Sequence, residues 1–455
     1  MVTPNRANHR RRAAIAGVVA GLVAGGAVGA ALLTGAAPPA DPALPRPTIL
    51  HAAPALVTAG APVELTAATF CAESGLPSCA ISAASAAVRP AGVSGWTEVS
   101  GRPDGGAFRF AVPASLVPPD GFSYRLVLRT ADGVAIAYPP GGDEAAIRVV
   151  TTAGLPVRDL GVIRWDRRRP ADEVVLRLPY GSGDGEVGRW GGEGELEAIG
   201  PSSFDVGPDG SIAVADWVNR RIQVFGAAGR LREVIASPTT RPVDLALTGD
   251  GGYVLSTLGT EATAFEVAAA GGVLGRYPVG FGVATRVAAS ATGGPRVQVG
   301  AAQWAAVRSA PGIPLAGDEQ GRTQTTSVPL ADGDIGVSAD IDGRSFAAVW
   351  TRPDGSRGGA VVRLPAGVAP GADYFVHPLA DGGAVVAKGV WDDTHFGVIV
   401  VRLDARGRIR STGLLPEPSI EQAARYSTVR YSPAGDVLVV FTEPGGIHID
   451  RFIVR

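Results

Sequence analysis

Residues 204–225, FDVGPDGSIAVADWVNRRIQVF, decide the fold class of this chain. Two runs with alternating apolar residues flank Pro208-Asp209-Gly210, a sequence typical of a tight turn between antiparallel strands. A polar segment then leads to a third run over 222–225. Three short antiparallel strands joined by tight turns are the unit of a β-propeller blade, so this stretch predicts one such blade.

The same residues carry a family resemblance. The stretch resembles the core of an NHL repeat, in which the positions of Asp216 and Asn219–Arg220 hold the loop between the second and third strands. The resemblance extends to the glycine-rich segment Gly181–Gly188 and to Gly200-Pro201. It implies an NHL-type β-propeller. Related six-bladed propellers include metal-dependent lyases and lactonases, so the resemblance leaves both a binding protein and an enzyme open.

A repeat of the first turn predicts the number of blades. Equivalent turn glycines lie 39 to 53 residues apart, close to the period of propeller blades: Gly210, Gly251, Gly294, Gly343, Gly382 and Gly435. These six turns predict six blades over 160–455. The last blade has only three strands of its own, and the isolated strand Glu173–Pro179 precedes the first blade. We expect this strand to complete the last blade and so close the ring.

Residues 48–151 have the pattern of a second β-domain. Short alternating runs are separated by Asp-Gly turns at Asp104-Gly105, Asp120-Gly121 and Asp132-Gly133. This pattern predicts an immunoglobulin-like or fibronectin-like β-sandwich with Trp96 in its core. Residues 151–159 are expected to be a linker. The whole exported part is therefore expected to be all-β, which agrees with the 63 glycines and 36 prolines of the full chain.

The N-terminus predicts export. Residues 1–12 carry four arginines and no acid, and residues 13–37 carry no charge. A basic tail in the cytoplasm followed by an apolar run of about 25 residues fits a transmembrane helix or an uncleaved signal. Cleavage of this leader, which would release a secreted protein, stays open. Residues 38–47 are proline-rich and predict an extended stalk. The origin of the chain is inferred to be bacterial.

Four glycines of the apolar run predict a dimer contact. They lie four residues apart, on one face of a helix, as repeated GxxxG: Gly17, Gly21, Gly25 and Gly29. Homodimerisation through this face is one expectation. Glycine- and alanine-rich signal sequences have the same appearance, so the spacing also fits a signal sequence.

Charge and cysteine content restrict partners and compartment. The formal net charge is −2, from 41 basic and 43 acidic residues, which excludes a nucleic-acid binder that relies on overall positive charge. Cys71 and Cys79 enclose seven residues that include a glycine and a proline. In an oxidising compartment this pair predicts a structural disulfide.

One candidate site is a face bearing tryptophans. The loops after the second strands carry the aromatic residues Trp217, Trp304, Trp350 and Trp391. Charged neighbours include Arg220 and Asp392. Aromatic rings among charges are suited to recognising a protein or a cell-envelope glycan. The alternative is that these tryptophans pack between adjacent blades.

A second candidate site lies in the predicted central channel. When the inner strands are aligned by their turns, the chemically distinctive residues of one column are Asp205, His377 and Arg430. If they converge, they mark a site; otherwise they line a solvated channel. No complete set of metal ligands is recognisable, so no cofactor is expected. Zinc or calcium in the channel is the alternative.

The sequence therefore favours an extracytoplasmic, membrane-tethered binding or scaffold protein. It would recognise a protein or cell-envelope polymer through one propeller face. The alternative is a propeller enzyme, a metal-dependent lyase or a lactonase or other hydrolase, with its site at the central channel.

Overall fold

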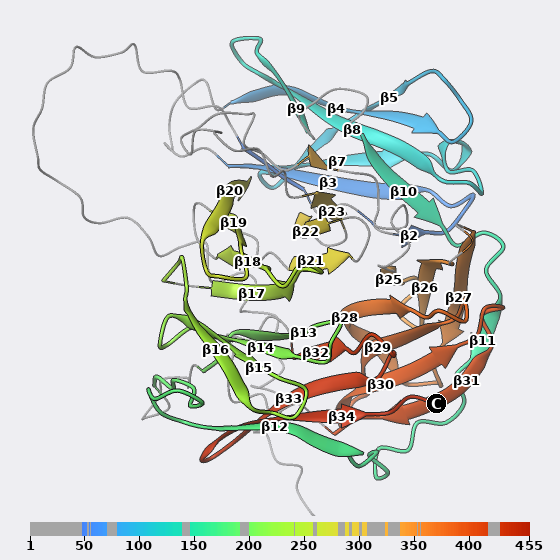
Figure 1. The fold of residues 1–455 in the computed structure, drawn as a ribbon. Helices are drawn as coiled ribbons and strands as arrows, with labels where there is room; N and C mark the ends of the chain where they lie inside the picture. The colour runs from blue at the N-terminus through green and yellow to red at the C-terminus, as the bar shows by residue number, and fades with distance from the viewer. Residues whose placement is uncertain are drawn as a thin grey trace, which may run out of the picture. The chain divides into compact units, whose positions relative to one another are not determined.

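The computed structural model is an all-β protein over the residues that it describes (Figure 1). These are residues 48–51, 54, 56–70, 80–138, 146–191, 200–240, 242–257, 262–280, 287–290, 294–299, 303–306, 324–325, 337–352, 354, 356–416 and 428–455. The helical structure within these described ranges is one 3₁₀ turn, η3 (Ala114–Leu116). No helix in them is long and apolar enough to cross a membrane. The expected membrane segment 13–37, the stalk 38–47 and the Cys71–Cys79 pair lie outside the described residues.

Two sheets near the N-terminus share one core. The first sheet has the order β1-β3-β7-β6: Thr48–His51, Val63–Phe70, Ala107–Val112 and Arg102–Asp104. The second has the order β2-β10-β8-β4-β5, with β9 beside β8: Leu56–Val57, Ile147–Thr151, Phe122–Thr130, Ile81–Pro90, Thr97–Ser100 and Ala135–Tyr138. Leu65 and Phe110 of the first sheet pack with Tyr124 and Leu126 of the second. Inward residues alternate with outward ones along β8, as expected for a sheet with one buried face.

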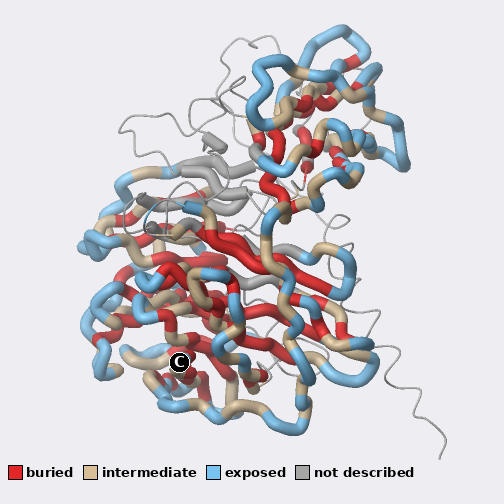
Figure 2. The backbone as a smooth tube through the Cα atoms, turned by 90° about the vertical axis from the view of Figure 1, so that its right-hand side faces the viewer, coloured by how far each residue is buried: buried red, intermediate tan, exposed pale blue. Residues whose placement is uncertain are grey.

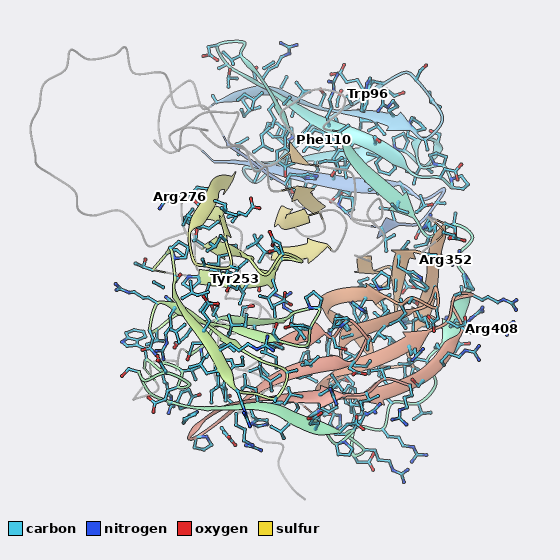
Figure 3. The ribbon with its side chains drawn as sticks, viewed as in Figure 1. Trp96, Phe110, Tyr253, Arg276, Arg352 and Arg408 are labelled. Atoms are coloured by element: carbon cyan, nitrogen blue, oxygen red, sulfur yellow. The ribbon has the colours of Figure 1, made fainter. Side chains whose placement is uncertain are left out.

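Trp96 does not lie in this core. Its ring lies 4.4 Å from the guanidinium of Arg89 and 5.1 Å from that of Arg125. All three residues are outside the buried cluster, whereas Phe110 is fully buried in it (Figure 3). The expectation of a core tryptophan was therefore wrong, because the ring is held by cation–π contacts on the outer side of the second sheet.

Six four-stranded sheets, here called blades 1 to 6, make up the rest of the described chain. Blades 1 to 3 are β13–β16 (Ser203–Val206, Ile212–Asp216, Arg221–Phe225, Leu231–Ala236), β17–β20 (Pro242–Leu247, Tyr253–Thr257, Ala262–Val267, Val273–Gly280) and β21–β24 (Val287–Ser290, Gly294–Val299, Gln303–Ala306, Gln324–Thr325). Blade 5 is β28–β31 (Ala369–Pro378, Ala384–Trp391, Phe396–Leu403, Ile409–Leu414). Blades 4 and 6 contain β25–β27 (Val337–Asp340, Ser345–Thr351, Arg357–Arg363) and β32–β34 (Val429–Tyr431, Val437–Glu443, Gly446–Phe452).

The predicted turn glycines explain how each blade begins. Five of them have positive φ, between 69° and 84°: Gly210, Gly251, Gly343, Gly382 and Gly435. Each lies between the first and second strands of its blade, where this backbone conformation strongly favours glycine. Gly294 differs, because it is the first residue of β22 and the turn before it lies outside the described residues.

Blades 4 and 6 are each completed by an earlier segment of the chain. The strand β12 (Glu173–Pro179) pairs antiparallel with β34, so the predicted closing strand is confirmed (Figure 1). The short strand β11 (Val157–Asp159) pairs parallel with β27. Residues 157–159 were expected to be part of a linker, which was wrong. Three residues are too few to show an alternating pattern, so only their pairing with β27 identifies them as a strand.

Neighbouring blades bury apolar side chains against each other. Phe346 and Trp350 of blade 4 share a core with Val386 and Val401 of blade 5. Similar clusters join blade 5 to blade 6, blade 6 to blade 1 and blade 1 to blade 2, and β17 contacts β21 of blade 3. Burial is concentrated in the strands, and exposed residues lie mainly in the turns (Figure 2). The order of contacts, 4-5-6-1-2-3, is propeller-like.

Blade 4 runs in the opposite direction to blade 5. Its third strand β27 leads into β28 through residues 364–368, without a fourth strand of its own. Consecutive antiparallel strands alternate in direction. After three strands the chain is therefore at the opposite end of the blade from where it would be after four, and the next blade begins from that end. Consistent with this, Trp350 at the end of β26 donates from Nε1 to the carbonyl oxygen of Gly382, 2.9 Å away, in the first turn of blade 5. The six blades are therefore not equivalent, contrary to the regular repeat expected.

Candidate functional site

Two of the three predicted channel residues lie together. Arg430 in β32 is buried, and its Nε lies 3.5 Å from Oδ1 of Asp205 in β13. Its Nη2 lies 2.6 Å from Oδ1 of Asp244 in β17, which is fully buried. Blades 6, 1 and 2 are consecutive because β12 closes blade 6 against blade 1, and this brings the three charges together.

The other polar contacts of this cluster are with the hydroxyl of Ser203, which donates to Asp244 Oδ1 at 2.5 Å and accepts from Arg430 Nη2 at 3.4 Å, and with the backbone. Arg430 donates to the carbonyl oxygens of Phe204 and Leu245, each at 2.8 Å. Asp244 accepts from the backbone amide of Val287 at 2.9 Å, and Asp205 accepts from that of Leu247 at 2.8 Å. The charges thus join the inner strands of blades 6, 1, 2 and 3. Their groups hold neighbouring strands in register.

The burial of Asp205 favours the protonated form of its carboxyl group. Burial raises the pKa of its carboxyl above the usual value, while Arg430 and the amide of Leu247 act in the opposite direction. The third predicted residue, His377, stacks on Tyr431 with ring centroids 5.3 Å apart. Asp244 was missed by the sequence reasoning. The available signal was a single carboxylate in the otherwise apolar strand Pro242–Leu247.

The loop between the second and third strands of blade 1 is organised by Asp216. This buried carboxylate accepts hydrogen bonds from Arg221 Nε at 3.0 Å, from Asn219 Nδ2 at 2.8 Å and from the amide of Gly188 at 2.9 Å. The predicted structural role of Asp216 and Asn219 agrees with these contacts. Arg220 differs: it has a φ of 55° and is exposed, while its neighbour Arg221 makes the ion pair.

Two of the predicted tryptophans, Trp350 and Trp391, do not lie on one face. Trp350 is fully buried and contacts the first turn of blade 5, whereas Trp391 is 47% exposed at the opposite end of β29. Trp350 is therefore an interblade core residue, inaccessible to a ligand in this structure. Trp217 is half-buried, and the side chain of Trp304 lies outside the described residues. The inverted direction of blade 4 is the reason that Trp350 and Trp391 are apart.

The turn after β29 gathers exposed aromatic and charged groups. Asp392 Oδ1 accepts from the amides of Thr394 and His395, each at 2.7 Å. Burial opposes ionisation of Asp392, but these amide hydrogen bonds lower the pKa of its carboxyl to about 2. The His395 ring stacks on Trp165, with centroids 5.2 Å apart. Residues 391–395 with Trp165 are here called the aromatic turn.

The three histidines of the predicted propeller do not form a metal site. His377 stacks on Tyr431, His395 on Trp165 and His448 on Phe441. Within the described ranges no group of three or more histidine, cysteine, aspartate or glutamate residues is arranged to hold a metal ion. The alternative of a metal-dependent enzyme therefore has no metal-binding site among the described residues.

Comparison with known proteins does not identify a family. No protein-family model and no curated protein matches the sequence. Among solved structures, hydrazine synthase of Kuenenia stuttgartiensis is similar at 11% identity and a TM-score of 0.34, covering 58% of this chain and 100% of that one. Virginiamycin B lyase of Staphylococcus aureus is similar at 10% identity and a TM-score of 0.32, covering 74% and 92%. The RRP9 WD40 repeats are similar at 12% identity and a TM-score of 0.30, covering 61% and 100%. At these scores the NHL assignment is not confirmed, and no activity follows.

Proposed function

We propose that the protein is an extracytoplasmic, membrane-tethered binding protein that recognises a cell-envelope polymer through the aromatic turn. The observation that carries the proposal is the grouping of Trp391, Asp392 and His395 on one exposed hairpin, with His395 stacked on Trp165. An exposed indole offers an apolar face, and the exposed imidazole of His395, held by the ionised Asp392, adds a polar group beside it. Recognition of a protein partner is the alternative occupant.

The turn is suited to binding because it is rigid. Amide hydrogen bonds fix Asp392, and Trp391 donates from Nε1 to the carbonyl oxygen of Pro370 at 3.1 Å. Groups that are already held in place lose little conformational entropy when a ligand binds. The charges of the inner strands support binding over catalysis in another way, since they are engaged with the backbone of neighbouring blades.

The tether and the finer family assignments are parts of the same proposal. Residues 1–12 would lie in the cytoplasm, 13–37 in the membrane and 38–47 in the stalk; leader cleavage would instead release a secreted protein. The NHL-type character of the propeller-like region rests on residues 204–225. The immunoglobulin-like or fibronectin-like character of residues 48–151 rests on their strand and turn pattern.

Sedimentation with a defined polymer tests this function. We expect the purified chain to sediment with protein-free bacterial cell-wall polysaccharide, and Trp391→Ala to weaken the affinity about tenfold, or ~1.4 kcal/mol. Leu274→Ala is the control, because Leu274 on blade 2 is also exposed, at 56%. Equal affinity of the Trp391 variant and the native chain would contradict a role of the aromatic turn. If the native chain does not sediment with the polysaccharide, the proposal that it binds a cell-envelope polymer is contradicted.

The enzyme alternative is tested by metal content. Elemental mass spectrometry of the chain purified without added metal would find about one zinc or calcium per chain if a metal-dependent lyase or lactonase is correct. That result would displace the binding proposal and direct mutagenesis to His377 and Asp205.

A further inference from the structure

A cavity lined by arginines lies at the other end of blade 5 from the aromatic turn. Its volume is about 650 Å³. It is formed by the turn between the first two strands, the turn between the last two and the C-terminal residue: Asp381, Arg402, Asp404, Ala405, Arg406, Arg408, Arg410 and Arg455. Five of these eight residues are arginines, although the whole chain has a formal charge of −2. Positive charge is therefore concentrated locally.

Only some of these arginines are neutralised. Arg402 pairs with Asp381 at 3.0 Å, and Arg410 pairs with Asp404 at 3.1 Å. Within the part of the chain that the structure describes, neither Arg406 nor Arg408 forms an ion pair with a carboxylate, although the charge of Arg408 is close enough to Asp404 to favour its ionised form; both arginines are exposed. Their guanidinium groups, each with five donors in a planar fork, are available to an external acceptor.

The backbone that carries these two arginines is fixed. Asp404 Oδ1 accepts from the amides of Arg406 and Arg408, each at 2.9 Å. Arg352 of blade 4 donates to the carbonyl oxygen of Ala405 at 3.1 and 2.7 Å, and Arg158 donates to that of Gly407 at 3.1 Å. Gly407 has a φ of 66° and packs directly against the backbone of Gly359. Arg352 and Arg408 lie at the same side of the molecule (Figure 3).

The contacts of Asp404 also limit its ability to neutralise the cavity. Burial opposes ionisation of Asp404, but the amides of Arg408 and Arg406 lower the pKa of its carboxyl below the usual value. The charged carboxylate is then directed to its own turn and to Arg410. This leaves the guanidinium groups of Arg406 and Arg408 facing solvent over a rigid turn.

We propose that this cavity, here called the arginine pocket, binds a small polyanion that carries two or more carboxylate or phosphate groups. Guanidinium forks bind such oxyanions with two parallel hydrogen bonds. The volume lies within the range of about 300–1,000 Å³ found for small-ligand pockets. The alternative ligand is the headgroup of a membrane lipid. Guanidinium groups around a cavity can enclose the oxyanions of a free ligand, whereas a flat bilayer surface would contact only the arginines that protrude. The pocket is separate from the aromatic turn, so the two proposals can fail independently.

Titration calorimetry of the full chain in neutral phosphatidylcholine nanodiscs tests this pocket. The probes are a short polygalacturonate oligomer, pyrophosphate and soluble dioctanoyl phosphatidylglycerol, each at 50 mM salt. We expect the oligomer to bind, and Arg406→Gln/Arg408→Gln to weaken its binding at least tenfold. Pyrophosphate should compete with the oligomer, since it presents the same oxyanion chemistry.

A charge-matched variant separates a pocket from a general charge effect. Arg230→Gln/Arg276→Gln removes the same charge from blades 1 and 2 and should change the affinity less than twofold. Equal weakening in both double variants would overturn the proposal, as would absence of oligomer binding. Binding of the phosphatidylglycerol alone would overturn it in favour of a lipid headgroup. Because Arg406 and Arg408 are exposed, unchanged thermal unfolding will verify that the variant is folded.

Discussion

Arg430 of blade 6 donates to Asp244 of blade 2, Nη2 to Oδ1 at 2.6 Å, across the inner strand of blade 1. Both side chains are buried, with exposed fractions of 5% for Arg430 and 0% for Asp244. Two residues that are 186 positions apart in the sequence are thus joined directly. The pair forms where blade 6, which β12 completes, packs against blade 1.

Removing one member of this pair should be strongly destabilising. We expect Arg430→Met to lower the free energy of unfolding by about 3–5 kcal/mol, since it leaves the Asp244 carboxylate buried without its cation. Urea unfolding followed by circular dichroism will measure the change. Arg177→Ala, which breaks a pair with Glu443 that is 58% and 40% exposed, is the control. It should cost less than about 1 kcal/mol. Similar losses in the two variants would contradict the structural role of Arg430.

The aromatic turn should lose its stabilisation only in strong acid. The pKa of Asp392 is lowered from 3.8 to about 2, so its ionised form is favoured by folding. Its contribution is complete above pH 3.8 and disappears as the pH falls through about 2. We expect Asp392→Asn to lower the melting temperature at pH 7, and the difference from the native chain to shrink below pH 3.8 and to vanish only below about pH 2. A difference that stays constant from pH 7 to below pH 2 would argue against the ionised carboxylate.

Trp350 and Trp391 should respond in opposite ways to solvent. Two variants are compared, each retaining one of these residues as the only tryptophan of blades 4 and 5. Acrylamide should quench the fluorescence of the variant that retains Trp391 and should quench that of the variant that retains Trp350 much less. Trp350→Phe should destabilise the chain by about 1–3 kcal/mol, because Gly382 loses its hydrogen-bond donor. Trp391→Ala should cost less, about 0.5–1.5 kcal/mol, because this ring is 47% exposed although it also loses its hydrogen bond to Pro370. Strong quenching of Trp350 would contradict its placement between blades.

The closing strand can be tested through one leucine. Leu178 in β12 is 3% exposed and packs in the cluster that joins blades 6 and 1. Leu178→Ala should therefore cost about 2–5 kcal/mol in thermal or urea unfolding. Val162, which is 83% exposed in the segment before β12, provides the control, and Val162→Ala should be neutral. Tolerance of Leu178→Ala would show that closure contributes little to stability.

Self-association in the membrane has a test of its own. If the GxxxG face joins two copies, Gly21→Leu/Gly25→Leu should abolish dimers in a membrane two-hybrid assay, because leucine side chains prevent close helix approach. Leu22→Ala within the same segment is the matched control and should leave association intact. Unchanged association of the glycine variant would remove this contact from the proposal.

Local chemistry was sufficient to predict much of the strand and turn pattern. Alternating residues around Pro208-Asp209-Gly210 act over a few positions, so β13, β14 and β15 follow from their own sequence. The isolated strand Glu173–Pro179 was predictable from counting, because an incomplete last blade requires one more strand. The partners of this strand agree with that prediction, Glu173 facing Arg451 and Pro179 facing Gly446.

The candidate sites were predictable only in part. Asp205 and Arg430 were singled out from aligned strands, but their shared partner Asp244 was not, since its role depends on which blades become neighbours. Arg406 and Arg408 gave no signal in a chain whose basic residues are almost all arginine. Their importance comes from the two pairs, Arg402–Asp381 and Arg410–Asp404, that leave them unneutralised in one cavity.

The sequence by itself determined the all-β character and the turns, because these depend on contacts between residues close along the chain, and the count of strands in the last blade determined the need for a closing strand. The tertiary structure alone decided the direction of blade 4, the addition of β11 and the burial of Trp350. Each of these depends on which distant strands pair. Because blade 4 has three strands of its own, Trp350 and Trp391 lie at opposite ends of blade 5, and no local pattern around either tryptophan encodes that separation.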